Sequence, residues 1–143
     1  MRNNDMADSL KRFHTAQERD YETALSEIRS GHKRSHWIWY IFPQIDGLGH
    51  SSTAQYYSIH GRTEAEAYWA DPILRRHLLE ISEALLSLQS NDAGEVMGYP
   101  DDLKLRSSMT LFYEVSGNSV FKKVLDKFYH GEEDPFTLKA LSN

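Results

Sequence analysis

Residues 31–49 read GHKRSHWIWYIFPQIDGLG, and this stretch decides how the rest of the chain can fold. Four aromatic side chains fall within the six positions 37–42, beside two basic residues and two histidines. We call residues 37–42 the aromatic segment. In a strand both of its faces would be apolar, so its spacing fits a buried strand and a buried helical turn equally well. Pro43 ends the segment in either case, and the segment is either structural core or one wall of a binding site.

The sequence on either side of the aromatic segment predicts helices. Apolar residues at helical spacing predict a first helix over about residues 8–30, which Gly31 ends. Residues 44–62 are rich in Gly, Ser and His, and we expect an ordered loop there with one helical turn near residues 54–59. Cap signals predict the starts of the later helices at Thr63-x-x-Glu66, Asp71-Pro72, Asp92-x-x-Glu95, Pro100-Asp101-Asp102, Asn118 or Ser119, and Asp134-Pro135.

These elements predict an all-α fold. We expect a single compact helical domain over residues 8–143, with six or seven helices, the aromatic segment buried, and residues 1–7 as a flexible tail. The chain has no cysteine, which excludes disulfides and thiol nucleophiles and fits a reducing cytosol. Its longest apolar run has six residues, whereas a membrane span needs about 20. The first residues form no hydrophobic run, so we expect a cytoplasmic protein without a signal peptide or a membrane partner.

The charge pattern separates the middle of the chain from the rest. The net charge is −5, yet Asp46 is the only acidic residue between His32 and Thr63. An acidic chain does not favour a nucleic-acid partner, because such binding relies on many contacts from Lys and Arg to phosphates. A local basic island suits one small anion, such as a phosphate or a carboxylate. The alternative is that Lys33 and Arg34 are solvated residues beyond a helix end, where the helix dipole favours them.

A second polar motif, DDLKLRSSMT, spans residues 101–110 at the predicted start of a helix. Helix starts bind anions through free backbone N–H groups, and two basic residues and three hydroxyls could add to such a site. In the structural alternative, Asp101 or Asp102 caps the helix, Asp102 pairs with Arg106 one turn later, and the small hydroxyls allow close helix packing.

Individual side chains suggest further chemistry. His32 and His36 have a metal-like spacing, but no third acidic ligand follows nearby, so we expect no metal and no cofactor. His36 is a candidate proton carrier because histidine changes protonation near neutral pH. No nucleophile-elbow pattern surrounds Ser107 or Ser108. Two tryptophans of the aromatic segment could stack a ring, although a core position is the commoner role.

Long stretches of the chain resemble a known family. KRSHWIWYIFPQIDGLGHS, AEAYWADPILRRHLLEIS, PDDLKLRSSMTLF and VFKKVLDKFYHGEEDPFTLKAL are similar to the uncharacterised bacterial family catalogued as domain of unknown function 1810, over about residues 8–142. That resemblance implies a small, mainly helical protein and no established activity. The C-terminal helices also resemble the end of NADAR/YbiA-like proteins, which are associated with cleavage of N-glycosidic bonds. No catalytic residue carries over from them.

These observations predict a small anionic or nucleotide-like ligand, held in a pocket between residues 33–44 and 102–110. If the protein is an enzyme, a hydrolase of N-glycosidic or phosphate-ester bonds fits best. The alternative is a helical protein–protein interaction module in which the aromatic segment is plain core. The predicted proton carriers are His36 and Asp102. The predicted ligand-binding residues are Lys33, Arg34, Ser35, Trp37, Trp39, Gln44, Lys104, Arg106, Ser107, Ser108 and Thr110.

Overall fold

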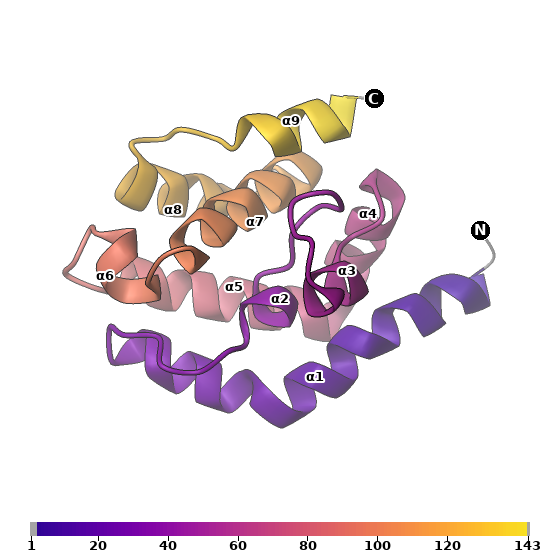
Figure 1. The fold of residues 1–143 in the computed structure, drawn as a ribbon, viewed down its shortest axis with the longest axis horizontal. Coiled ribbons are helices and arrows are strands. Elements are labelled where there is room, and N and C mark those ends of the chain that lie inside the picture. The colour runs from indigo at the N-terminus through magenta and orange to yellow at the C-terminus, as the bar shows by residue number, and fades with distance from the viewer. Residues whose placement is uncertain (1–2, 143) are drawn as a thin grey trace.

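The computed structural model describes residues 3–142, and within that part the chain folds into nine helices (Figure 1). An all-α single domain is confirmed. The count exceeds the predicted six or seven because residues 38–41 and 52–57 form two further, very short helices. In chain order they are α1 (Asn3–Arg29), α2 (Ile38–Ile41), α3 (Ser52–Tyr57), α4 (Arg62–Ala70), α5 (Pro72–Leu86), α6 (Ala93–Met97), α7 (Asp101–Ser116), α8 (Ser119–Tyr129) and α9 (Pro135–Ser142).

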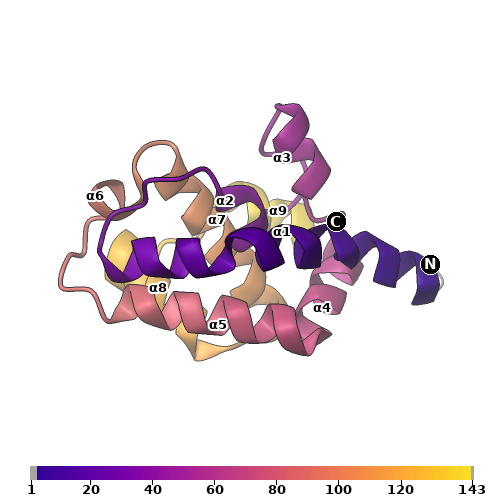
Figure 2. The same cartoon turned by 90° about the horizontal axis from the view of Figure 1, so that it is seen from below.

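Helix α1 is the longest element and lies alongside α5 (Figure 2). Its apolar stripe includes Phe13, Ala24 and Ile28, which are fully buried, as the helical spacing predicts. Gly31 follows its end with φ +88°, a conformation that glycine adopts without strain. Residues 3–7 belong to α1 and residues 1–2 lie outside the described residues, so the flexible tail over residues 1–7 stays a prediction.

The aromatic segment is a helical turn, which its spacing left open. Helix α2 covers its centre, and the backbone N–H of Phe42 donates to the carbonyl of Ile38 at 3.0 Å. The exposed fraction of Trp37 and of Phe42 is 1% or less, while Trp39 remains partly exposed. The segment therefore fills the space between α1 and α7 as a compact plug of core.

The loop that follows the aromatic segment is closed at its base, where its two ends contact each other. Residues Ile45 and Ile59 form an isolated parallel bridge, in which Asp46 N–H donates to Ile59 O at 2.9 Å and Ile59 N–H donates to Gln44 O at 2.8 Å. Helix α3 lies inside this loop, close to the single turn that was predicted. We call residues 46–58 the α3 loop.

The predicted capping box at Thr63 is wrong. Helix α4 begins one residue earlier, with Gly61 at its N-cap and φ +95°, and no side chain caps it. Thr63 is exposed inside the first turn, so it cannot serve as the N-cap. The carboxylate that bonds to the backbone before the helix is that of Glu64 and not of Glu66. It accepts from the backbone N–H of His60 at 2.9 Å.

The other helix starts lie where the cap signals place them, although neither Asp101 nor Asp102 caps α7, whose N-cap is Pro100. Asp71 caps α5 by accepting from the N–H groups of Ile73 and Leu74, and Asp92 and Asn118 do the same for α6 and α8. The core that these helices share lies between the α1–α5 pair and the α7–α8 pair, with α9 packed on α7 (Figure 1). Within residues 3–142 no helix is long and apolar enough to cross a bilayer.

Candidate functional site

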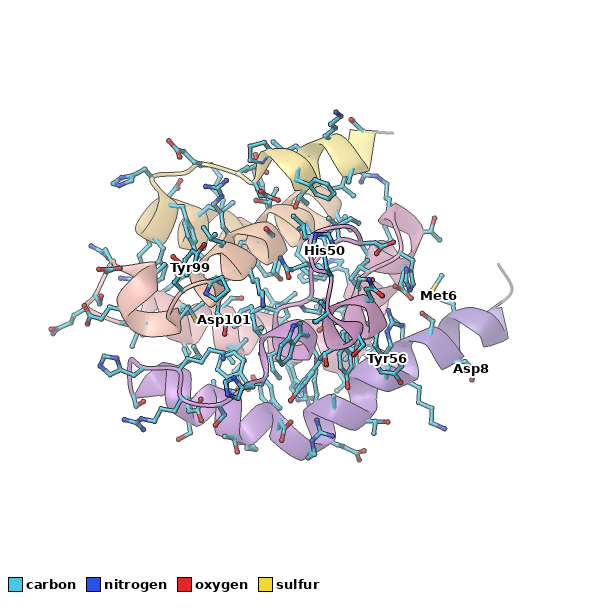
Figure 3. All side chains as sticks on the ribbon, in the orientation of Figure 1. Met6, Asp8, His50, Tyr56, Tyr99 and Asp101 are labelled. Atoms are coloured by element: carbon cyan, nitrogen blue, oxygen red, sulfur yellow. The ribbon has the colours of Figure 1, made fainter. Side chains whose placement is uncertain are left out.

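The two polar motifs of the sequence meet through one buried ion pair. Lys33 Nζ lies 2.7 Å from Asp101 Oδ2, and the Lys33 side chain is only 5% exposed. Lys104 approaches the other oxygen of the same carboxylate at 3.5 Å. Figure 3 shows Asp101 at the start of α7, from which it reaches the segment that follows α1. The charge of Lys33 is thus neutralised inside the protein and holds two chain segments together.

The two tryptophans of the aromatic segment lie under these ammonium groups. Lys33 Nζ lies 4.8 Å from the centre of the Trp37 ring, and Lys104 Nζ lies 5.4 Å from that of Trp39. Both contacts are cation–π interactions, which stabilise an ammonium group over an aromatic face. The Trp37 ring is buried and serves as core.

A carboxylate that the sequence analysis did not single out organises residues 34–37. Glu27 of α1 accepts hydrogen bonds from the backbone N–H of Arg34 (2.8 Å) and Ser35 (2.9 Å), the Ser35 hydroxyl (2.6 Å) and the Trp37 indole N–H (2.9 Å). Burial raises the pKa of Glu27, but the four hydrogen bonds outweigh it and lower the pKa from 4.5 to about 2. Glu27 was missed because its partners lie seven to ten residues ahead, a spacing that marks no motif.

A pocket of about 310 Å³ opens between the start of the α3 loop and the first half of α7. It brings together Gln44, Lys104, Arg106 and Ser107 from the predicted set. The remainder of its wall consists of Leu48, Pro100, Leu103 and Asp134. The other predicted residues do not line it; His36 is exposed, and its carbonyl accepts from the Tyr40 hydroxyl at 3.4 Å. We call this cavity the α7 pocket.

Arg106 and Asp134 are two of the three charged side chains that line the α7 pocket, with Lys104. Arg106 Nη2 lies 3.7 Å from Asp134 Oδ1, which is a long and single contact for an arginine and a carboxylate. The second oxygen of Asp134 accepts from the N–H and the hydroxyl of Thr137 at 3.1 and 2.6 Å, so Asp134 caps α9. Asp134 was predicted only as a cap, and its place in the pocket wall follows from the packing of α9 on α7.

The hydroxyl groups of residues 107–110 are occupied within the protein or covered by it. Ser107 donates to Leu103 O at 3.1 Å, and Thr110 donates to Arg106 O at 2.8 Å while accepting from Asp134 N–H at 2.9 Å. Ser108 is fully buried, and its hydroxyl has no partner within the described residues. These contacts fit close packing of α7, the structural role that the sequence analysis weighed.

Asp102 lies on the side of α7 that faces α8. Its backbone carbonyl accepts from the Tyr129 hydroxyl at 2.5 Å, and one side-chain oxygen, Oδ1, is buried without a partner in the described part of the chain. Burial, with the nearby charge of Asp102, raises the pKa of Tyr129. Asp102 does not line the α7 pocket.

Comparison with known proteins identifies the family of this chain. The model of the family described as "Protein of unknown function (DUF1810)" matches residues 7–141. The chain belongs to the DUF1810 family. The resemblance found in its motifs is thereby confirmed, and the family description assigns no activity. No protein with a curated description matches this DUF1810 chain.

A solved structure shares the DUF1810 fold seen here. The conserved hypothetical protein Rv1873 from Mycobacterium tuberculosis, whose crystal structure was determined at 1.38 Å, is 42% identical to this chain and superposes with a TM-score of 0.91. The match covers 94% of this chain and 96% of that one. At this identity and coverage, the helix arrangement is common to both proteins.

Proposed function

We propose that the protein binds a small molecule carrying a phosphate or carboxylate group in the α7 pocket. The observation that carries the proposal is the loose Arg106–Asp134 pair, because its 3.7 Å separation leaves the guanidinium without a bidentate partner. A guanidinium fork that no carboxylate holds through two bonds matches the geometry of two oxygens on one anionic group. Lys104 adds a second cation, and the Gln44 amide adds a neutral donor and acceptor.

The size and lining of the pocket support a small ligand. Its volume of about 310 Å³ lies at the lower end of the roughly 300–1,000 Å³ common for ligand sites. Leu48, Pro100 and Leu103 offer an apolar surface beside the charged groups. Such a ligand would place its anionic group between Arg106 and Lys104 and its less polar part against these three residues.

Hydrolysis remains a prediction from the sequence, and the geometry favours binding. Among the described residues that line the pocket there is no histidine and one carboxylate, that of Asp134. In a hydrolytic reaction Asp134, rather than His36 or Asp102, would therefore be the group in position to carry a proton.

Isothermal titration with inorganic phosphate, adenosine monophosphate and ADP-ribose tests the proposal. We expect at least one of them to bind, and Arg106→Gln to weaken that binding about tenfold or more, because a hydrogen bond to a charged group is worth about 1.5–3 kcal/mol. The matched control is Arg76→Gln, which removes an exposed arginine of α5 and should leave binding unchanged. Absence of binding by all three, or equal effects of both variants, would refute the proposal.

An interaction module is the second candidate, and exposed apolar side chains beside the pocket favour it. Tyr99, two residues before α7 (Figure 3), is 82% exposed, and Leu103 in the first turn of α7 is 49% exposed. A partner protein would cover both side chains. Slowed amide exchange around Tyr99 when a partner binds, with no response to the three small molecules, would favour this candidate over the first.

A further inference from the structure

A second cavity, separate from the α7 pocket, lies at the end of the molecule where α1 begins. It measures about 610 Å³ and is lined by Met6, Ser9 and Arg12 of α1, Gln55 and Tyr56 of α3, His60, and Thr63 and Glu64 of α4. Figure 3 shows Met6 and Tyr56 at this end of the molecule, on two different helices. We call this cavity the α1 pocket. None of the site residues predicted from the sequence lines it, and it shares none of the residues of the α7 pocket.

The floor of the α1 pocket is a buried ion pair whose charges cancel. Arg12 Nη2 lies 3.0 Å from Glu64 Oε1, and the two side chains are only 9% and 4% exposed. The same guanidinium donates to Ser58 O at 2.8 Å and lies over the Phe13 ring at 4.4 Å. Glu64 also accepts from the Ser9 hydroxyl and, at 2.9 Å, from the N–H of His60.

The matched charges of this ion pair select against a charged ligand, although the buried Nε of Arg12 has no partner within the described residues. Both oxygens of Glu64 already accept hydrogen bonds, and the terminal nitrogens of Arg12 already donate them. An added anion would meet the buried carboxylate without a free cation to compensate, and burying an uncompensated charge is costly. The floor therefore favours a ligand without net charge.

The upper wall of the α1 pocket has neutral hydrogen-bonding groups and one aromatic ring. Tyr56 is 59% exposed, although its ring is held edge-on against Tyr57 at 4.8 Å. Gln55 donates its amide N–H to His50 O at 3.3 Å, and its amide oxygen accepts nothing within residues 3–142. The hydroxyl of Thr63 is exposed to solvent at the same rim.

We propose that the α1 pocket binds an uncharged planar heterocycle, such as the base of a nucleoside, stacked on Tyr56. A fixed, solvent-facing tyrosine offers a π-face on which a planar ring stacks. The Gln55 amide offers one donor and one acceptor in a plane, which suits the edge of a base. Met6, on the opposite helix, presents a polarizable thioether that makes favourable contacts with aromatic rings.

Titration of ¹⁵N-labelled protein with adenosine, uridine, adenosine monophosphate and glucose tests this inference. We expect a nucleoside to shift the signals of the Gln55 side-chain amide and the Thr63 backbone amide. Adenosine monophosphate should bind this pocket no tighter than adenosine does, because the one arginine among the described lining residues, Arg12, is already paired with Glu64. No shift with either nucleoside up to about 10 mM, or a response to glucose alone, would overturn the inference.

Substitutions of Tyr56 provide the second arm. Tyr56→Ala should weaken nucleoside binding about 5- to 150-fold, the range that loss of one stacked base implies. Tyr56→Phe, which keeps the ring, should bind within about twofold of the natural protein. Tyr99→Ala removes another exposed tyrosine and is the matched control. Equal affinity of Tyr56→Ala and Tyr99→Ala would overturn the inference, whereas loss of phosphate binding in Arg106→Gln concerns only the α7 pocket.

Discussion

Replacing Glu27 by glutamine should destabilise the protein in a pH-dependent way. The carboxylate accepts four hydrogen bonds from residues 34–37, and these lower its pKa from 4.5 to about 2. A group with a depressed pKa in the folded state stabilises the fold above its unfolded-state pKa. That contribution is complete above about pH 4.5 and is lost as the pH falls toward about 2.

The magnitude follows from the same pKa values. The difference between 4.5 and about 2, at about 1.4 kcal/mol per pH unit, sets an upper bound of about 3 kcal/mol. Solvent reaches part of the Glu27 side chain, so screening reduces the expected effect to about 1–2 kcal/mol. Glu27→Gln keeps an oxygen for the N–H donors and removes the charge. Glu27→Ala should cost more, because it leaves the indole N–H of the buried Trp37 without its acceptor.

Urea unfolding followed by circular dichroism at about pH 7 and about pH 3 measures both variants. Glu18→Gln is the matched control, an exposed carboxylate on the same helix. We expect Glu27→Gln to lose stability at the higher pH and to approach the natural protein at the lower one. Equal losses at both pH values, or the same behaviour in Glu18→Gln, would refute the assigned role of the Glu27 charge.

Three further predictions concern other charged groups. Lys33→Met should cost about 2–4 kcal/mol in chemical unfolding by breaking the buried pair with Asp101, and adding Asp101→Asn should recover part of the loss. Glu133→Gln should raise the stability of the protein above about pH 7. Burial, and then the nearby Glu114, raises the pKa of Glu133 from 4.5 to about 7. The natural protein should therefore lose stability as the pH rises from 4.5 through about 7. A flat pH profile in the natural protein would contradict this. Asp71→Ala should lower thermal stability by about 1–2 kcal/mol through loss of the α5 cap, and an unchanged melting temperature would count against that role.

The sequence predicts helices well where a local signal fixes them. Asp71-Pro72 and Asn118 mark helix starts because a cap needs only the next two or three residues. The capping box at Thr63 fails because Gly61 and the buried Glu64 fix the start of α4 through tertiary contacts. The form of the aromatic segment was also undecidable locally, since a segment buried on all sides carries no period.

The site was predictable in part. Residues 33–44 contact the start of α7 through the Lys33–Asp101 pair, one residue before the predicted range 102–110, and through Lys104 over Trp39 within it. The ion pair uses one of the cations expected for a ligand. The α7 pocket is lined by residues further along the two segments, Gln44 and Arg106. Asp134, which precedes α9, completes its wall because α9 packs on α7. Such a long-range approach leaves no trace in local spacing.

The parallel bridge between Ile45 and Ile59 has a mechanical consequence. It joins the two ends of the α3 loop, and Tyr57 within the loop packs on Phe13 and Tyr40, so the loop is held as one unit. Leu48, near one end, forms part of the α7 pocket, and Tyr56, near the other, forms part of the α1 pocket. A ligand that displaced the loop at one pocket would therefore also displace the wall of the other. Occupancy of the two pockets would then be thermodynamically linked, each ligand altering the affinity for the other by the same factor.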